Sequence, residues 1–232
     1  MNTIETRRPH HVRVSDHHLA GTAAASAVTF AVLLGCLHVV RPELDPTWRF
    51  VSEYALGPAG FLMTAAFLAV ALCSAALAVL MWRQVPGRVG RAGAVLAAVS
   101  AAGMVIAATF PTDPITAEEA TLSGTLHNVG GQLNLTPFAV LLLTISLQRV
   151  ASWRSVMPIL WVVTGATLAA SAAFMITAAG ATDGFGPGVL TGLFGRVMLL
   201  GYVVWAVVAA GHVMRFDRTS SSAAAGAPSR RR

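Results

Sequence analysis

Six long apolar runs dominate this sequence and constrain its fold more than any other feature. They cover residues 19–40, 58–82, 90–110, 122–147, 156–179 and 188–214. A helix of about 20 residues crosses the hydrocarbon core of a bilayer. Because lipid offers the backbone no hydrogen-bond partner, runs of this length are expected to be helical. The sequence therefore predicts an all-α, polytopic membrane bundle of six transmembrane helices.

The residues between these runs are too few and too short to form a soluble domain. Only 11% of the 232 residues are charged, against about 25% in a typical soluble domain. We expect a polar cytoplasmic tail at residues 1–18, the transmembrane domain at 19–214, and a disordered, basic cytoplasmic tail at 215–232. The formal charge of +6 would suggest nucleic acid for a soluble protein. Here the arginines flank apolar runs, so no nucleic-acid partner is predicted.

The first apolar run could instead be a cleaved signal segment. It follows a charged start, as signal peptides do, and Leu33-Leu34-Gly35-Cys36 faintly resembles a lipoprotein cleavage box. However, the run is about 20 residues long, which exceeds the usual apolar region of a signal peptide. No A-x-A site follows it, and apolar residues continue past Cys36. We therefore expect a retained first helix.

The arginines predict the orientation of the bundle. All 16 basic residues are arginines, and 13 of them fall in the tails and loops that six spans place on one side. The other side holds Arg41, Arg49 and Arg196, together with 7 of the 10 acidic residues. Arginine-rich loops stay in the cytoplasm, so both termini are expected inside a cell (plasma) membrane. The absence of lysine, with abundant alanine, is typical of a GC-rich bacterial genome.

Arg196 is the most informative single residue. It lies 8 residues past the start of its apolar run, which is about 12 Å along a helix. An arginine at that depth costs about 2.5 kcal/mol or more unless it reaches the surface or finds a partner. We expect a carboxylate partner, either Glu53 or Asp113, from loops on the arginine-poor side. Such a pair could line a ligand site, or it could only fix the packing of the helices.

The run at residues 122–147 is the most polar of the six. Its polar and small residues form two neighbouring stripes, with His127, Gly131 and Asn134 on one and Asn128 and Gln132 on the other. Polar side chains at membrane depth face the bundle or a wet cavity rather than lipid. Pro137 interrupts backbone hydrogen bonding about one turn back. These side chains could serve a ligand, or they could simply bond one helix to another.

His127 and Asp113 are the candidate catalytic residues. A histidine titrates near neutral pH and a carboxylate can orient it, so the two could act as an acid/base pair. The candidate ligand-binding residues are Glu53, Asn134 and Arg196. His38, His127 and an acid could instead hold a metal ion, but their spacing is not diagnostic. Nucleophile-elbow, H-E-x-x-H and phosphate-loop motifs are absent from the sequence, so no metal and no cofactor is predicted.

Three short motifs follow one another along the chain. They are Ser52-Glu53-Tyr54 with Gly57, Phe110-Pro111-Thr112-Asp113, and Gly124 followed by His127. Together they resemble the domain-of-unknown-function 998 family, over residues 20–214. The resemblance implies a six-helix bacterial or archaeal membrane protein and supplies no reaction. It directs attention to the same residues, Glu53, Asp113 and His127.

The sequence leaves several functions open. The polar residues at the outer helix ends could bind a lipid or a small-molecule ligand, and an enzymatic form of that site could support hydrolase-like chemistry. The chain could instead be a non-catalytic membrane partner or structural subunit. A small transporter is less favoured, because most of the charges are shallow and no broken helix is evident that would match the helix with Pro137. The lipid bilayer is the one partner that is predicted outright, and the oligomeric state stays open.

Overall fold

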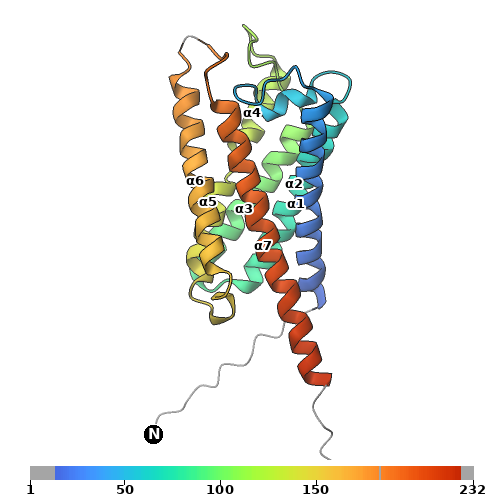
Figure 1. Ribbon diagram of the computed structural model, residues 1–232, viewed down its shortest axis with the longest axis vertical. Coiled ribbons are helices and arrows are strands. Elements are labelled where there is room, and N and C mark those ends of the chain that lie inside the picture. Colours follow the sequence, from blue (N-terminus) through green and yellow to red (C-terminus); the bar gives the residue numbers. More distant parts are fainter. Residues whose placement is uncertain (1–13, 183, 226–232) are drawn as a thin grey trace, which may run out of the picture.

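The computed structural model describes residues 14–182 and 184–225, and within these ranges its regular structure is entirely helical (Figure 1). The long helices are α1 (Val14–Val40), α2 (Gly60–Gln84), α3 (Gly87–Thr109), α4 (Leu122–Gln132), α5 (Thr136–Leu147), α6 (Met157–Gly180) and α7 (Thr191–Ala225). Two short 3₁₀ helices, η1 (Val51–Ala55) and η2 (Ala151–Trp153), lie in connecting segments. Residues 1–13, Asp183 and residues 226–232 lie outside the described residues.

Six segments of the structure are long and apolar enough to cross a membrane. Five are single helices, and α4 and α5 together make the sixth, Leu122–Leu147. Mean hydropathy is lowest in the segment formed by α4 and α5, at 1.4, and highest in α2, at 2.3. The prediction of an all-α membrane bundle with six spans is confirmed.

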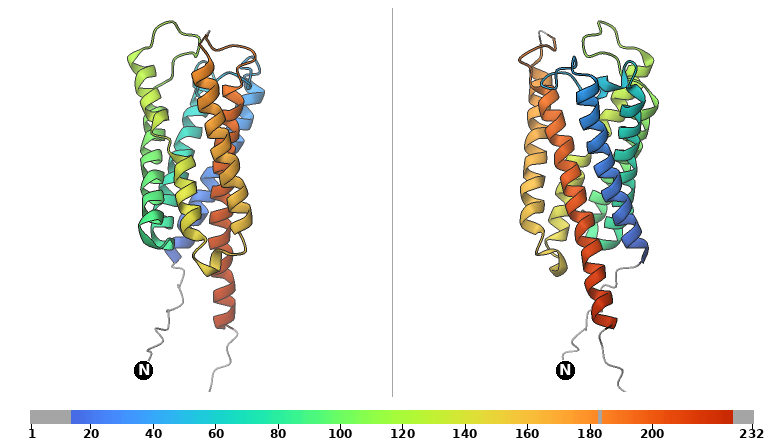
Figure 2. Two further views of the ribbon diagram at one scale, coloured as in Figure 1. Left: turned by 90° about the vertical axis from the view of Figure 1, so that its left-hand side faces the viewer. Right: turned by 45° about the vertical axis from the view of Figure 1, so that its right-hand side comes forward.

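The helices run along the long axis of the molecule, and the connecting loops gather at its two ends (Figures 1 and 2). α1 packs between α2 and α7, α3 packs against α2, α4 and α5, and α6 packs against α7 and α5. Among the described residues, α4 makes no comparable contact with α6 or α7. The upper part of the broken span therefore packs mainly against α3.

The two ends of the bundle carry different loops. The loops at residues 41–59, 110–121 and 181–190 lie at one end, which we call the arginine-poor end (Figure 1). α1 begins and α7 ends at the opposite, arginine-rich end. An even number of spans requires this arrangement, and it matches the grouping of loops that the arginine pattern predicted.

Glycines bring α3 and α4 into backbone contact. A Cβ added to Gly103 would lie 2.6 Å from the carbonyl oxygen of Gly130, and one added to Gly130 would lie 2.6 Å from the carbonyl oxygen of Gly103. Side chains at these positions would force the helices apart. Gly131 is different, because an added Cβ there meets no atom within 4 Å. One face of α4 is therefore tightly packed, and the neighbouring face is open.

The span predicted as one continuous helix over residues 122–147 is broken. Residues 133–135 separate α4 from α5, near the middle of the span. Pro137 has no backbone N–H and cannot continue the helical hydrogen-bond ladder, so the helix restarts around it. Pro137 is visible in the sequence, whereas the break itself appears only in the structure.

Side chains bond the backbone at the start of α5. The Leu135 N–H donates to Ser100 Oγ on α3, at 2.9 Å. The Thr136 N–H donates to Asn134 Oδ1, at 3.4 Å. Unpaired backbone groups are costly in a membrane, and these contacts replace bonds that a continuous helix would have made.

The structure also corrects two predicted boundaries. α1 begins at Val14 rather than at residue 19, and Asp16 in its first turn forms an ion pair with Arg83 of α2, at 2.8 Å. α7 continues to Ala225, so part of the segment predicted as a disordered tail from residue 215 is helical. A long apolar run marks the part of a helix that lies in lipid. It does not mark where the helix ends outside the lipid.

Candidate functional site

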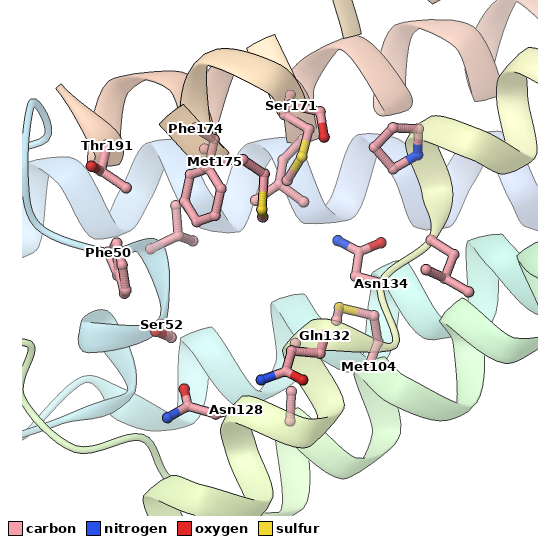
Figure 3. A pocket seen from close by; sticks show the side chains of 18 of the residues that line it. Phe50, Ser52, Met104, Asn128, Gln132, Asn134, Ser171, Phe174, Met175 and Thr191 are labelled. Carbon is pink, nitrogen blue, oxygen red and sulfur yellow. The ribbon is translucent and has the colours of Figure 1, made fainter. Parts of the chain in front are cut away.

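A cavity of about 580 Å³ lies in the arginine-poor half of the bundle. Its walls come from η1 and the residue before it, from α2 and α3, from the broken span α4–α5, and from α6 and α7. Asn134 and Leu135 place the break itself in the wall (Figure 3). Non-helical backbone at membrane depth is tolerated where it lines such a cavity. Two predicted site residues, His127 and Asn134, line it.

One wall of the cavity carries carboxamide side chains. Asn128 and Gln132 lie one turn apart on α4, and Asn134 follows in the break, with all three amides directed toward the open space (Figure 3). Asn134 uses its oxygen to accept from Thr136, which leaves its NH₂ group for the cavity. Within residues 14–182 and 184–225, the amides of Asn128 and Gln132 make no hydrogen bond. This wall therefore offers both donors and acceptors that no protein group satisfies.

The opposite wall is largely apolar. It is formed by Phe174 and Met175 of α6, with Thr191 and glycines at the start of α7 (Figure 3). Met175 is 59% exposed, and Phe138 of α5, below the amide wall, is 54% exposed. The side chains of Met175 and Phe138 therefore line the cavity and are also exposed on the outer surface of the bundle. The cavity therefore opens sideways between α4 and α6, above α5.

Aromatic rings cover the cavity toward the arginine-poor loops. Phe50 lies with its ring 5.8 Å from that of Phe174 and 5.4 Å from that of Phe185. Phe50 and Phe174 are also part of the lining. Such edge-to-face and tilted ring contacts form a stable apolar cover. Access from the side is therefore less obstructed than access along the axis of the bundle.

His127 is buried beneath the amide wall, with 5% of its surface exposed. Its Nδ1 lies 3.0 Å from the carbonyl oxygen of Ala107 and 2.9 Å from that of Phe110. Because carbonyl oxygens only accept, Nδ1 carries the proton and donates to both. In the neutral ring Nε2 then holds the lone pair. The ring packs on Phe67, with centroids 5.7 Å apart.

Asp113 does not orient His127. Its carboxylate accepts from the Thr121 N–H at 2.8 Å and from the Thr121 hydroxyl at 2.8 Å. Thr121 is the N-cap of α4, and its hydroxyl oxygen accepts from the Gly124 N–H. Asp113 also lies outside the cavity lining. The structure therefore gives the predicted acid/base pair no contact, because each partner is bonded elsewhere.

Among the described residues Arg196 pairs with no carboxylate, so the prediction that it pairs with Glu53 or Asp113 is wrong. Its side chain is 5% exposed. The guanidinium donates to His38 Nε2 at 2.9 Å, to the Arg49 carbonyl oxygen at 2.7 Å, to the Gly192 carbonyl oxygen at 3.0 Å and to the Tyr54 hydroxyl at 3.4 Å. Its centre also lies 5.6 Å from the Tyr54 ring centroid. Neutral acceptors and an aromatic face thus solvate this cation.

Glu53 is also bonded to protein groups close to it. It is 2% exposed and forms an ion pair with Arg49 at 2.8 Å. The same carboxylate accepts from the Phe50 N–H at 2.9 Å and from the Ile115 N–H at 3.0 Å. The last bond joins the loop before α2 to the loop before α4. Glu53 therefore fixes two outer loops relative to each other.

The loop that precedes η1 is also tied to α7. The Leu193 N–H donates to the Thr47 carbonyl oxygen, at 2.9 Å. The hydroxyl and N–H of Thr47 donate to Asp45 and hold the pKa of that carboxyl below its ordinary value. Together with Arg196, these bonds set the position of Phe50, which covers the cavity.

The predicted site residues therefore divide into two groups. His127 and Asn134 line the cavity, whereas Glu53, Asp113 and Arg196 form an outer layer that holds the loops around it. We call this outer layer, with Arg49 and His38, the charged layer. The residues that the sequence analysis missed are the apolar lining from α6 and α7. A Phe or Met in an apolar run gives no signal that separates a cavity wall from a lipid-facing surface.

The alternative of a metal site gains no support. His38 donates from Nδ1 to the Leu34 carbonyl oxygen at 2.7 Å and accepts at Nε2 from Arg196. Both of its ring nitrogens are therefore occupied. In the described part of the chain, no three side chains of His, Cys, Asp or Glu are grouped so as to hold a metal ion.

Comparison with known proteins identifies one family. Residues 23–212 match the family described as "Protein of unknown function (DUF998)". This match covers most of the chain, including every helix that lines the cavity. Neither the curated proteins nor the solved structures gave a match.

Proposed function

Since this chain belongs to the DUF998 family of membrane proteins of unknown function, we propose a role from its own cavity: it binds an amphiphilic, lipid-like molecule. The molecule enters sideways from the bilayer, through the opening between α4 and α6. Its polar group meets the amides of Asn128, Gln132 and Asn134, and its chain lies against Phe174 and Met175.

The observation that carries this proposal is the pair of unsatisfied amides at membrane depth. Both side chains are exposed in the structure, so at membrane depth each amide contacts either lipid or the contents of the cavity, and lipid offers it no hydrogen-bond partner. Asn128 and Gln132 have no protein partner among the described residues, yet they face the cavity rather than another helix. A polar headgroup placed there would satisfy them. Helix packing alone requires no amide at either position.

The size and lining of the cavity agree with this reading. Ligand sites typically measure about 300–1,000 Å³ and are mostly apolar, with a few polar groups that orient the ligand. A volume of about 580 Å³ fits a headgroup and the first part of a chain. The remaining chain would lie in the bilayer beyond Met175 and Phe138.

The proposal includes an orientation. Arginine-rich loops remain on the cytoplasmic side, so we set both termini in the cytoplasm and the protein in the cell (plasma) membrane. The cavity then opens to the outer leaflet. Lipids of that leaflet, or lipids that arrive there, are the candidate ligands.

Binding has more support than hydrolase-like chemistry. Asp113 does not contact His127 and lies outside the lining. The charged layer has a clear packing role, because Glu53 and Arg196 bond the outer loops to each other and to α7. That role agrees with the alternative of a structural subunit, but it leaves the open cavity unexplained.

Transport of the same molecule is a second candidate, favoured by the broken span. Transporters place substrate sites near the membrane midplane, beside discontinuous helices. The break between α4 and α5 lies near the middle of its span and in the cavity wall. Flux of a labelled lipid between the leaflets of proteoliposomes would separate transport from binding alone.

The binding proposal can be tested by filling the cavity. Gly131→Trp adds a large side chain where an added Cβ meets no atom within 4 Å, in the cavity lining. Gly165→Trp is the matched control, since Gly165 on α6 is also open but lies outside the lining. Native mass spectrometry would count the lipids that each protein retains after mild extraction from the membrane.

We expect Gly131→Trp to lower the occupancy of the most tightly retained lipid about tenfold, a loss of about 1.4 kcal/mol of binding free energy. Gly165→Trp should retain it as the wild type does. Equal retention by all three proteins would contradict the proposal.

A further inference from the structure

Among the residues that the structure describes, no Arg, Asp or Glu side chain lines the cavity. Its polar lining consists of the three amides, the hydroxyls of Ser52, Ser171 and Thr191, and His127. The amides and hydroxyls are uncharged, and each can both donate and accept. The proton of His127 Nδ1 is committed to two backbone carbonyls. The interior therefore presents hydrogen-bonding groups without a fixed charge.

The charged groups nearest to the cavity already have hydrogen-bond or ion-pair partners in the protein. Arg49 pairs with Glu53, and Arg196 donates to four acceptors. Asp113 is committed to Thr121. None of the four lines the cavity. An ionic headgroup would thus enter a site whose neighbouring charges have their own partners.

An unpaired ion in such a site is disfavoured, because burial of a charge is costly unless it is paired and hydrogen-bonded. A hydroxyl group makes no such demand. It can donate to an amide oxygen and accept from an amide NH₂, which is what Asn128 and Gln132 offer from one side of the cavity. Sites of this kind gain selectivity because the wrong ligand leaves buried polar groups unpaired.

We infer that the ligand carries an uncharged, hydroxyl-rich headgroup, as a glycosylated diacylglycerol does, and that anionic phospholipids are excluded from the cavity. This inference rests on the proposed function and adds the class of headgroup. The amides of Asn128 and Gln132 are its specificity-determining groups. The absence of a cation among the lining residues provides the discrimination against a phosphate.

The test compares two lipids that both expose hydroxyl groups and that differ in charge. Glucosyl-diacylglycerol exposes more hydroxyls and is uncharged, whereas phosphatidylglycerol carries a phosphate. Each is made with the same photoreactive diazirine chain and is added to phosphatidylcholine nanodiscs that hold the full chain. After illumination, mass spectrometry measures labelling of the α6 segment around Phe174 and Met175.

We expect glucosyl-diacylglycerol to label that segment about tenfold more than phosphatidylglycerol does. The double variant Asn128→Leu/Gln132→Leu should lose this preference. Gln132→Arg places a cation in the lining and should reverse it toward phosphatidylglycerol. Gln148→Arg, at the arginine-rich end of α5, is the matched control and should behave as the wild type does. Size-exclusion profiles confirm that each variant is folded.

The outcomes separate the two claims. If phosphatidylglycerol labels the wild type more strongly, and Gly131→Trp abolishes that labelling, the headgroup inference is overturned while the binding function stands. If neither lipid gives labelling that Gly131→Trp abolishes, both are overturned. Equal labelling by glucosyl-diacylglycerol in wild type and in the double Leu variant would also overturn the inference, because the amides would then not bind the headgroup.

Discussion

The charged layer and the amide wall lie close together, but they differ in how their polar atoms are satisfied. Arg196 and Glu53 are almost completely buried, and each makes three or more hydrogen bonds to protein groups. Asn128 and Gln132 are exposed and make none within the described residues. Polar groups that are hydrogen-bonded within the protein stabilise the fold. Polar groups at membrane depth that lack a protein partner are available to bind a ligand. From this difference we infer that the charged layer stabilises the fold and that the amide wall binds the ligand.

The largest effect on stability is expected from Glu53→Ala. It removes the acceptor of two backbone N–H groups and leaves Arg49 without its ion-pair partner. Breaking a buried pair on one side typically costs about 3–5 kcal/mol. Unfolding in a denaturing detergent titration measures this loss.

Glu43→Ala is the control for Glu53→Ala. Glu43 also pairs with an arginine, Arg41, but its side chain is 58% exposed. Surface pairs of this kind contribute little to stability, because solvent screens them, so Glu43→Ala should lose much less than Glu53→Ala. If both variants lost the same free energy of unfolding, Glu53 would not have the anchoring role assigned to it.

Arg196→Leu should destabilise the protein by about 2 kcal/mol. The substitution leaves the Arg49 carbonyl oxygen and His38 Nε2 without their donor, and an unsatisfied buried acceptor costs about 1–3 kcal/mol. The same unfolding titration measures it, with exposed Arg154→Leu as the comparison. Stability equal to that of the wild type would mean that the loops are held without Arg196.

Neighbouring glycines on α4 should respond in opposite ways. Gly130→Ala places a methyl group 2.6 Å from the Gly103 carbonyl oxygen, and overpacking of this kind costs about 1–3 kcal/mol. Gly131→Ala meets open space and should be neutral or stabilising, by up to about 1 kcal/mol. Equal losses in the two variants would show that α4 is packed on both faces and that the cavity wall is closed.

The smallest effect on stability is expected from the amide wall. Asn128→Leu/Gln132→Leu removes no protein hydrogen bond, so its free energy of unfolding should stay within about 0.5 kcal/mol of the wild type. A loss above about 2 kcal/mol would indicate that both amides bond to protein, and the contrast between the two regions would disappear.

The sequence was sufficient for the overall fold. Six runs of adequate length dictate six spans, because lipid leaves the backbone no other structure. It also identified Arg196 as a residue that needs a partner. It could not name that partner, because backbone carbonyls and the ring of Tyr54 leave no trace in a pattern of charges. Only the folded chain brings Arg49 and Gly192 to the guanidinium.

The cavity was partly predictable. The polar stripes of the fourth span indicated an inward-facing surface, and His127 and Asn134 do line the cavity. The break depends on a long-range contact, the bond from Leu135 to Ser100 on another helix, which no local signal encodes. The opposite wall could not be predicted from the sequence for a simpler reason. Met175 is apolar, and so are the lipid-facing residues beside it.

A density map of the protein in a lipid nanodisc would test the central claim most directly. We predict elongated density between α4 and α6, with its polar end within hydrogen-bond distance of Asn128 and Gln132 and its chain against Met175. A map in which α6 packs directly on α4, with both amides bonded to protein groups, would contradict the account.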